Sequence, residues 1–599
     1  MLISVKPPLK STCSKLVSGN FALIEILRRW GIKNYAGVNG GGVIKLAQYL
    51  SPLTHLEQLE DDVPRLLTMN EYVAGFFPLG HYLATGRPAA TILTTGAATK
   101  LGLSGLTEAK LHNIPAVYLV ALNSTKVHGL APLQDVSEHG MNLIPQLQAE
   151  LGDGCVVIDD LNSIEEKLYE VFQILHQSQP VAIAFHPDIL SQDIDINSLF
   201  LPSIQPRSKI NVSEVDALVA YLSKIPSTKR IILYVGEEVS RRWDAASCES
   251  MSKLIDELSH RLKSKIVWSV NGANAVSETN PYSCGNILFG GNDQALELWK
   301  SLNKDDVLIA IGLDPYEYVL NCNQIQAGFV WHLTNLDRPY GHINKTFEHR
   351  AAFDYRQVKG DIALILKEVL DRLPNIKSRN SLVPNHQSLN TRTINRKVHP
   401  ETVDLVSFYE KLGQHWQPNS IGFDDICMAY KDRPYLMQRR HPHIRFYSMY
   451  HGSAMGGAFG LACGAKLANP SLHTFLFSGD GCWRLYGGAL ADAFKLGLRL
   501  FIINNGSYGI IQQGAPSILP GIKESLYHAD LPNIDFVAAA KAHGWDGLKV
   551  KPDLSNLSEI MDACYSPNNR SLLVEVPVDA TQIIGLNPRV SNLRDECFL

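Results

Sequence analysis

The tetrapeptide Gly-Asp-Gly-Cys occurs twice in this chain, at residues 152–155 and at residues 479–482. An aspartate between two glycines can form a surface turn, because Asp and Gly both tolerate turn dihedral angles. The same residues can also hold a metal–diphosphate group, since the carboxylate is a hard oxygen ligand and glycine lets the backbone approach phosphate. The residues around each copy favour one chemistry or the other.

The two copies follow different kinds of segment. The first follows "LIPQLQAEL", a polar helical pattern, and is predicted to start a turn after a helix. The second follows the apolar run "TFLFS" and precedes "LYGGALADAFKLGL", a helical pattern rich in small residues. A strand, a Gly-Asp-Gly loop and a helix in that order place the loop at the carboxyl end of a parallel strand, where phosphate binds. We therefore expect chemistry at Asp480 and only a turn at Asp153.

A second ligand follows the second copy at a suitable distance. The apolar run "LRLFIINN" ends in Asn504 and Asn505, and 22 residues separate Gly481 from Asn504. This length fits one helix and one adjacent strand, so Asp480 and Asn505 are expected on neighbouring strand ends, able to share one cation. The same offset from Gly154 gives Gln177 and Ser178, which offer no comparable ligand pair.

The elements that must position these residues are short apolar runs that alternate with helical patterns. Buried runs between helices predict parallel sheets covered by helices on both faces. We expect an α/β protein with three doubly wound parallel-sheet domains, a linker rich in Asn, Ser and Pro, and a tail that forms a loop or a lid. The predicted boundaries are 1–190, 205–372 and 401–580 for the domains, 373–400 for the linker and 581–599 for the tail. The runs that predict strands lie at 89–95, 116–122 and 181–186, at 230–236, 265–270, 306–312 and 329–336, and at 474–478, 498–505 and 571–578.

Composition excludes several classes of protein. The 599 residues carry a formal net charge of −4 and no basic tract, so no nucleic-acid partner is expected. No apolar run approaches the roughly 18 residues that a membrane-spanning helix needs. The first residues, "MLISVKPPLKSTCSKL", contain two prolines where a signal peptide needs an uninterrupted apolar core. The ten cysteines are scattered without CxxC spacing, which favours reduced thiols and a cytoplasmic location.

The Gly-Asp-Gly…Asn-Asn pattern resembles the diphosphate motif of thiamine diphosphate (ThDP)-dependent enzymes of the three-domain type, and matches extend over most of the chain. The resemblance implies a pyrimidine-binding domain, a central domain and a diphosphate-binding domain, in that order. It also implies Mg²⁺, held by Asp480, Asn505 and the backbone carbonyl of Ser507. The residues further assigned to cofactor binding are Gly479, Gly481, Cys482, Tyr508 and Ile510.

The segment "MNEYVAGFFPLGHYLATGRPAA" resembles the helix that carries the activating carboxylate in this family. In the family, this carboxylate shifts the aminopyrimidine to its imino tautomer, which then takes the thiazolium proton. The resemblance places Glu71 in that role, one residue after the possible helix cap Asn70. The alternative is an exposed first-turn glutamate that the helix dipole favours.

The segment "FYSMYHGSAMGGAFGLACGAKLA" (446–468) resembles the turn beneath the pyrimidine. There, an apolar side chain wedges between the two rings and bends the cofactor. Met455 occupies that position, and the Ser453 carbonyl and the Met455 N–H would bind the pyrimidine edge. The alternative is that Met455 only fills the core, as a methionine among Gly and Ala often does.

The departures from the family pattern bear on the reaction. The stretch "YAGVNGGGVIKLAQYL" resembles a loop of acetolactate synthases, with Gly41 where pyruvate decarboxylases carry Asp, and Ile511 stands where they carry a pocket Glu. Gln134 in "LQD" resembles a further acetolactate synthase segment, although an exposed loop residue is the alternative. An enzyme that releases aldehyde must protonate its intermediate with a positioned acid. An apolar pocket without that acid favours attack on a second carbonyl compound, which is carboligation.

The match to acetolactate synthases is incomplete. A tryptophan that they carry after the Asn-Asn pair falls on Gly514, so we expect a larger pocket and a substrate that is larger than, or different from, pyruvate. Flavin (FAD) is not expected in the central domain, because "NGANAVSE" resembles the flavin loop only loosely, but the sequence leaves it open.

Two other functions remain open. The chain could be a 2-oxo acid decarboxylase that releases aldehyde, with one of five histidines as proton donor. It could also be a non-catalytic ThDP-binding regulatory subunit, although the intact Glu71, Asp480 and Asn505 argue against this. For an enzyme, the resemblance implies 2-oxo acid substrates and a homodimer or homotetramer with its active sites between subunits. The five histidines are His128, His139, His441, His443 and His451, and the last of these is also a candidate pocket residue.

Overall fold

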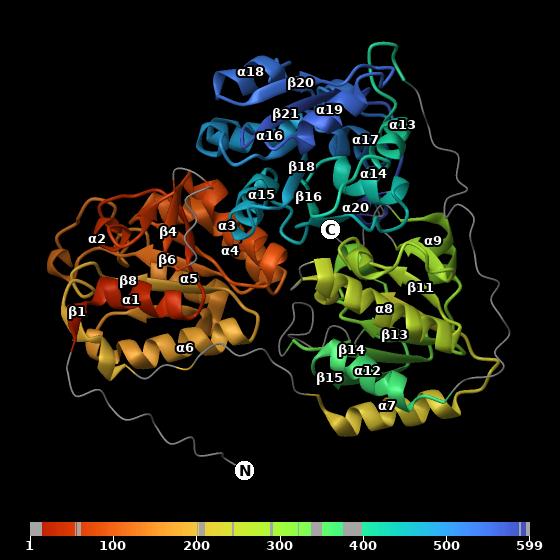
Figure 1. Ribbon diagram of the computed structural model, residues 1–599, viewed down its shortest axis with the longest axis horizontal. Helices are drawn as coiled ribbons and strands as arrows, with labels where there is room; N and C mark the ends of the chain where they lie inside the picture. The colour runs from red at the N-terminus through yellow and green to blue at the C-terminus, as the bar shows by residue number, and fades with distance from the viewer. Residues whose placement is uncertain are drawn as a thin grey trace. The chain divides into compact units, whose positions relative to one another are not determined.

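The computed structural model describes residues 15–594, except for 54–55, 57–61, 200–201, 203–209, 242–244, 288–290, 321–322, 337–349, 375–397, 586 and 588 (Figure 1). The predicted linker therefore lies largely outside the described residues. The chain divides into two units, each of which is described by itself. The first contains 1–78, 87–110 and 115–205, and the second contains 79–86, 111–114 and 206–599.

The first unit contains a seven-stranded parallel sheet. A separate antiparallel pair joins β1 (Leu16–Ser18) to β9 (Asp193–Asp195). Buried residues of helices α1 (Gly19–Arg29) and α6 (Ile164–His176) form one core cluster with the sheet. The strands in spatial order are β3 (Ser51–Pro52), β4 (Arg65–Thr68), β2 (Asn34–Gly37), β5 (Ala90–Leu93), β6 (Val117–Ala121), β8 (Val181–Phe185) and β7 (Cys155–Ile158).

Helices α3 (Glu71–Thr85) and α4 (Ala97–Leu111) approach each other through glycine in the first unit. A Cβ atom built on Gly105 would lie 2.0 Å from the carbonyl oxygen of Gly75, and one built on Gly75 would lie 2.4 Å from that of Gly102. Both distances are far below van der Waals contact, so only glycine permits this approach. The close packing of the two backbones thereby fixes α3, whose first residue is Glu71, against α4.

The second unit contains two six-stranded parallel sheets. The central sheet alternates its side chains between two cores, as the period of two in a strand requires. Alternate residues of β10 pack with α7 (Val212–Lys224), α8 (Ala245–Leu262) and α12 (Ile362–Arg372), and the others pack with α9 (Asp293–Lys300) and α10 (Glu317–Leu320) (Figure 1). Its strands in spatial order are β12 (Ser283–Asn286), β11 (Lys265–Trp268), β10 (Ile231–Val235), β13 (Val307–Ile311), β14 (Phe329–Thr334) and β15 (Asp354–Lys359).

The third sheet carries the second Gly-Asp-Gly-Cys copy. Its core contains phenylalanines of β18 and β19 packed against α13 (Leu405–Leu412), α14 (Ala429–Leu436) and α19 (Leu557–Tyr565). Helix α15 (Gly457–Ala468) contacts β18, and α18 (Phe536–Ala542) contacts the strands at the far edge. The strands in spatial order are β17 (Ile444–Ser448), β16 (Ser420–Asp424), β18 (His473–Gly479), β19 (Arg499–Asn504), β21 (Leu572–Pro577) and β20 (Asp546–Lys549).

Two asparagine side chains attach the edge strand β17 to the loop after β11. The Asn274 amide exchanges hydrogen bonds of 2.8 and 3.0 Å with the backbone carbonyl and N–H of Phe446, and the Asn271 amide does the same with Ser448 at 2.9 and 2.8 Å. These residues are two apart on β17, so the amides occupy the donors and acceptors that a neighbouring strand would take. Both asparagines belong to "NGANAVSE", which thus joins the central sheet to the third sheet.

The α/β prediction with three parallel sheets is confirmed. Each of the ten apolar runs contains a strand, because a long apolar run between helices needs burial on both faces. The domain boundaries stay predictions. Strands with small or polar residues, such as β12 and β15, carried too little apolar pattern to be found. Among the described residues, no helix is long and apolar enough to cross a membrane.

We expect Gly105→Ala to lower the free energy of unfolding by about 1–3 kcal/mol, because the new methyl group forces α3 and α4 apart. This loss should appear although alanine is the better helix former. The matched control is Gly488→Ala, where a Cβ atom meets nothing within 4 Å. Calorimetry on the full chain measures both. Equal unfolding midpoints for the two variants would contradict the close backbone approach.

Candidate functional site

The candidate site lies at the carboxyl ends of three neighbouring strands of the third sheet. Strands β18 and β19 pair in parallel with Gly479 opposite Ile503, so Asp480 and Asn505 follow neighbouring strand ends, as their spacing predicted. Helix α16 (Asp480–Tyr486) begins directly after β18. The first copy of the tetrapeptide instead forms a 3₁₀ turn between α5 (Leu143–Leu151) and β7, with Asp153 exposed. Only the second copy therefore joins a strand to a helix, and it does so without the predicted loop, because Gly479 ends β18 and Asp480 begins α16.

Oxygen atoms gather around Asp480. Its carboxylate accepts a hydrogen bond of 3.1 Å from the Gly481 N–H, and burial raises the pKa of Asp480 to about 6. The Asn505 side-chain oxygen accepts one of 3.2 Å from the Ser507 N–H, which fixes the loop after β19. The Ser507 hydroxyl is buried and has no hydrogen-bond partner among the described residues. These hard oxygen donors suit a divalent cation and phosphate oxygens.

Small residues keep the junction between β18 and α16 compact. A Cβ atom on Gly481 would lie 2.7 Å from the Tyr508 ring, and one on Gly479 would lie 2.9 Å from Cβ of Cys427. The thiol of Cys482 donates a hydrogen bond of 3.1 Å to the Ile426 carbonyl, and burial raises its pKa well above the ordinary value. The thiol therefore stays protonated and holds the junction in place.

The turn before α15 is held by a carboxylate that the sequence patterns did not single out. Asp425 accepts hydrogen bonds from the Gly456 N–H at 2.8 Å, from the Ile426 N–H at 2.8 Å and from the Ser478 hydroxyl at 2.6 Å. Ser453 has a φ of 54°, which is uncommon for a residue with a side chain and indicates a constrained turn. Asp425 thus ties the turn with Ser453 and Met455 to the end of β18.

A cavity of about 410 Å³ opens at this site. It brings together all ten predicted cofactor-binding residues, together with Ile511 and Gly514 of α17 (Gly509–Ile518) and with residues of α20 (Arg589–Arg594). Its remaining wall is mostly apolar, because Ile, Met, Leu and Tyr side chains dominate. The cofactor-binding predictions that line it are Ser453, Met455, Gly479, Asp480, Gly481, Cys482, Asn505, Ser507, Tyr508 and Ile510.

Three predicted residues belong to the first unit. Glu71 begins α3, and the Asn70 side chain accepts a hydrogen bond of 2.9 Å from the Val73 N–H, which caps the helix as expected. Gly41 and Gln134 are both exposed, and Gln134 has a φ of 57°. Their roles stay predictions.

None of the five candidate histidines lines the cavity among the described residues, and the choice of a proton donor stays a prediction. His128 lines a separate cavity in the first unit, and His139 is exposed. His443 contacts the Trp416 carbonyl, and His441 packs beside it. His451 is fully buried at its side chain, a placement that does not suit a donor to substrate.

Gly514 does not simply enlarge the cavity, as its comparison with tryptophan predicted. A Cβ atom built on Gly514 would lie 3.3 Å from Cγ2 of Val590 in α20. The space that the missing ring leaves is therefore partly occupied by the C-terminal helix. The sequence could not reveal this, because the two residues are far apart along the chain.

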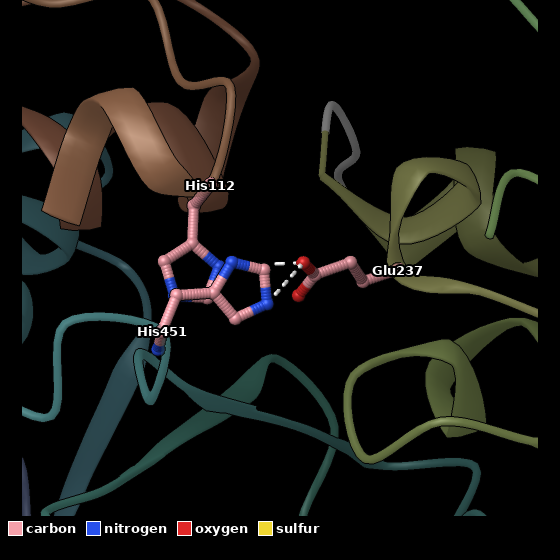
Figure 2. Close-up of side chains that lie close together, drawn as sticks. All are labelled: His112, Glu237 and His451. Atoms are coloured by element: carbon pink, nitrogen blue, oxygen red, sulfur yellow. Dashed lines mark hydrogen bonds and ion pairs between the residues drawn. The ribbon is translucent and has the colours of Figure 1, made fainter. Parts of the chain in front are cut away.

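His451 belongs to a buried cluster with His112 and Glu237 (Figure 2). His112 Nδ1 and His451 Nε2 each lie 3.3 Å from the same Glu237 carboxylate oxygen. Arg241 donates a hydrogen bond of 2.7 Å to this oxygen and also pairs with Asp314. Burial by itself would raise the pKa of Glu237, but Arg241 and the histidines hold it well below its ordinary value.

Two histidines and a carboxylate suggest a metal centre, but the ring geometry does not suit one. The imidazole planes of His112 and His451 stack at 3.7 Å with an angle of 15°, so no single point lies in both ring planes along their lone pairs. In addition, His112 Nε2 accepts the His451 backbone N–H at 3.3 Å, which leaves the proton of neutral His112 on Nδ1, toward Glu237. We therefore assign the cluster a structural role, as a set of buried polar contacts within the chain.

The cluster occupies the topological switch point of the central sheet. The strand order there is the classical 3-2-1-4-5-6 of doubly wound nucleotide-binding folds, with the switch between β10 and β13. Glu237 follows β10 and Asp314 follows β13, and both pair with Arg241 at these strand ends. The ring of His451, two residues before Ser453, stacks on His112 and on Tyr316 at this crevice. Glu237 and His112 gave no signal in the sequence, because single residues of this kind form no pattern.

Comparison with known proteins agrees with the site. The family description "Thiamine pyrophosphate enzyme, C-terminal TPP binding domain" matches residues 433–576, which include Asp480, Asn505 and the turn at Met455. The description "Thiamine pyrophosphate enzyme, N-terminal TPP binding domain" matches residues 17–143, which include Glu71. The chain is a member of the thiamine pyrophosphate enzyme family. Thiamine pyrophosphate is another name for ThDP.

Relatives of this thiamine pyrophosphate enzyme extend over nearly its whole length. The mitochondrial acetolactate synthase catalytic subunit of Aspergillus candidus is 21% identical over 94% of this chain and 81% of its own. The acetolactate synthase isozyme 3 large subunit of Escherichia coli strain K12 is 22% identical over 95% and 96%. The acetolactate synthase of Mycobacterium avium is 22% identical over 94% and 88%. The likeness therefore includes the residues of the central sheet, which lie in the sequence between the two matched ranges.

We expect Glu237→Gln to lower the free energy of unfolding by about 3–5 kcal/mol, because it leaves the buried Arg241 with less compensation. Glu249→Gln, which removes an exposed partner of Arg440, should cost about 1 kcal/mol or less. The lowered pKa of Glu237 means that its stabilisation is present above the ordinary pKa of about 4.3 and is lost as the pH falls. Denaturant titrations at neutral and acidic pH measure both variants.

A stabilisation of the wild-type protein by Zn²⁺ that Glu237→Gln removes would contradict our assignment. It would show that the histidine rings reorient to bind a metal ion.

Proposed function

We propose that this chain is a ThDP- and Mg²⁺-dependent enzyme that decarboxylates a 2-oxo acid and joins the remaining fragment to a second carbonyl compound, as an acetolactate synthase-like carboligase. The observation that carries the proposal is the cavity at the ends of β18 and β19, which has Asp480 and Asn505 on one side and an apolar wall on the other. The oxygen atoms at one end suit a metal ion and a diphosphate, and the apolar wall suits a reaction from which water is excluded.

The residues at the polar end fit the cofactor. Asp480, the side-chain oxygen of Asn505 and the Ser507 carbonyl would hold Mg²⁺, and the buried Ser507 hydroxyl would meet a phosphate oxygen. Met455 would support the bend between the two rings. When bound, ThDP supplies a carbanion that attacks the 2-oxo acid and stores the electrons released with CO₂. FAD has no role in this proposal.

Glu71 would serve as the carboxylate at the aminopyrimidine. Glu71 is the first residue of α3, and the Asn70 cap fixes the backbone from which its side chain projects. We also propose a homodimer or homotetramer in which Glu71 of one subunit serves the cavity of another, because the resemblance that assigns Glu71 places each active site between subunits. The presence of Glu71 together with Asp480 and Asn505 supports an enzyme over a non-catalytic subunit.

The lack of a strong acid in the cavity wall favours carboligation over the release of aldehyde. Asp480 and Arg589 are the charged residues among the described lining residues, and Asp480 lies at the metal end. The other proton-bearing groups are weak acids, since burial raises the pKa of Tyr430 and of Cys482 well above their ordinary values. Protonation of the intermediate is then slow, and a second carbonyl compound competes for it.

We expect Asp480→Ala to abolish binding of ThDP in the presence of Mg²⁺, because it removes a metal ligand from a buried site. Asp153→Ala changes the exposed turn in the other tetrapeptide and should leave the affinity unchanged. Isothermal titration calorimetry measures both dissociation constants. Equal losses in the two variants would show that the polar end of the cavity does not hold the cofactor.

We expect the wild-type protein, supplied with ThDP, Mg²⁺ and a panel of 2-oxo acids, to form mainly 2-hydroxyketones or 2-hydroxy-3-oxo acids, with free aldehyde minor. Ile511→Glu should shift the products toward aldehyde, because Ile511 lines the cavity and the new carboxyl group can donate a proton. Mass spectrometry measures the product ratio. Aldehyde as the main wild-type product would favour the decarboxylase instead, and the absence of any CO₂ release would favour the regulatory subunit.

A further inference from the structure

Both ring nitrogens of the buried His451 face oxygen atoms. Nδ1 lies 2.8 Å from the backbone carbonyl oxygen of Leu111, and Nε2 lies 3.3 Å from a carboxylate oxygen of Glu237 (Figure 2). A carbonyl oxygen can only accept a hydrogen bond, so the contact with Leu111 requires a proton on Nδ1. A neutral imidazole has no second proton, and the lone pair of Nε2 would then lie against a carboxylate oxygen. This arrangement is favourable only when a second proton lies between His451 and Glu237.

The second proton does not belong to the carboxylate. The same Glu237 oxygen accepts a hydrogen bond of 2.7 Å from Arg241, and His112 Nδ1 lies 3.3 Å from it. Burial by itself raises the pKa of Glu237, but these neighbours hold it well below its ordinary value. Glu237 is therefore ionised at neutral pH. The proton lies on Nε2, which makes His451 an imidazolium.

The rings around His451 favour its charged form. Its ring stacks on Tyr316, with 4.0 Å between the centroids and 28° between the planes, and on His112 from its other contact at 3.7 Å. The face of an aromatic ring attracts a cation, and this attraction grows where water is excluded. Tyr450 lies edge-on to His451 at 5.0 Å, and burial raises the pKa of its hydroxyl well above the ordinary value, so Tyr450 adds no charge.

The charges of the cluster also balance only with this proton. Two buried carboxylates, Glu237 and Asp314, pair with the single guanidinium group of Arg241. When both carboxylates are ionised, one negative charge lacks a counter-charge, and a buried charge of this kind is strongly destabilising. The imidazolium of His451 supplies the second positive charge.

This balance makes the cluster respond to pH. Burial and the neighbouring His112 lower the pKa of His451, whereas Glu237 and a backbone carbonyl raise it. Burial raises the pKa of Asp314 to about 7, and the nearby Glu238 accepts hydrogen bonds of 2.6 and 2.7 Å from a threonine hydroxyl and a backbone N–H. The stabilisation that the shared proton provides is therefore present in acid and is lost as the pH rises through about 7.

His451 directly precedes the turn that lines the cavity. The Tyr316 hydroxyl donates a hydrogen bond of 2.8 Å to the His451 carbonyl, and the His451 N–H donates one of 3.3 Å to His112 Nε2. Ser453, two residues later, has a φ of 54°, and both Ser453 and Met455 line the cavity. A backbone in this sparsely populated region persists only where its surroundings hold it. The contacts that fix His451 therefore also support the turn.

We propose that His451 is a positioning residue that acts as a buried imidazolium, whose Nε2 proton binds it to Glu237 and holds the turn of Ser453 and Met455 in the conformation that binds ThDP. This inference rests on the proposed function, which places ThDP in the cavity. As the pH rises, the proton passes to solvent and leaves a lone pair against a carboxylate. The turn then loses part of its support, and the affinity for ThDP falls.

Neutron diffraction locates the proton directly. In crystals of the deuterium-exchanged full-length protein at pH 7, we expect deuterium on both ring nitrogens of His451 and on Nδ1 alone of His112. Deuterium on a carboxyl oxygen of Asp314, with none on His451 Nε2, would overturn the proposal.

The pH dependence of cofactor binding supplies a second test. Isothermal titration calorimetry of the full-length protein with ThDP and Mg²⁺ covers pH 7 to 9, above the pKa of about 6 of Asp480 and of Asp425, so both carboxylates stay ionised. We expect the dissociation constant of the wild-type protein to rise about tenfold over this range, as the loss of one charge-assisted contact implies. A constant that does not change with pH would contradict the proposal.

Two variants separate the two ring nitrogens. His451→Gln places an amide N–H near the position of Nε2, which can donate to Glu237 without titrating, so its dissociation constant should no longer change with pH. His451→Asn can reproduce only the donor to Leu111, so it should bind ThDP about tenfold more weakly than the wild type at pH 7 and equally weakly at pH 9. The matched control is His543→Gln, which should keep the wild-type pH dependence, because His543 Nδ1 makes the same 2.8 Å contact with a backbone carbonyl, that of Ala539.

A pH dependence that persists in His451→Gln would overturn the proposal, because it would arise from another group. If neither variant folds, the neutron structure and the wild-type titration still decide. Failure of the proposed function appears separately, as wild-type protein that binds no ThDP at any pH.

Discussion

The candidate site depends on the buried carboxylate of Asp425, which joins three segments that are distant in sequence. It accepts hydrogen bonds from the Ile426 N–H after β16, from the Ser478 hydroxyl in β18 and from the Gly456 N–H before α15. Burial raises the pKa of Asp425 to about 6, and the hydrogen bonds from these three donors oppose the rise. Strand β18, which ends directly before Asp480, and the turn that holds Met455 are thereby fixed relative to each other.

A second set of buried polar contacts joins the central sheet to the same turn. Asn271 and Asn274 complete the edge of β17, and Glu237 and Arg241 pair at the switch point of the central sheet. His451 inserts there between the rings of His112 and Tyr316. These contacts hold the backbone that leads to the cavity against the switch point of the central sheet.

The cavity gains its chemical character from a combination of elements. The polar end comes from the residues that follow β18 and β19, and the apolar wall comes from α17 together with α20. Gly514 permits the approach of Val590, and the same packing brings Arg589 to the wall. The glycine at position 514 thus leaves room for a helix of the C-terminal tail beside the cavity.

The sequence by itself determined the parallel sheets, the different settings of the two Gly-Asp-Gly-Cys copies and the place of Asp480 and Asn505 at neighbouring strand ends. These features are local or periodic, because apolar runs report burial and strand-to-strand spacing is set by one helix and one loop. Only the tertiary structure showed the contacts of Asp425, Glu237 and Gly514. Each of these acts through a partner that folding brings from a distant part of the chain. No spacing in one sequence encodes such a contact, since its distance depends on how helices and sheets pack.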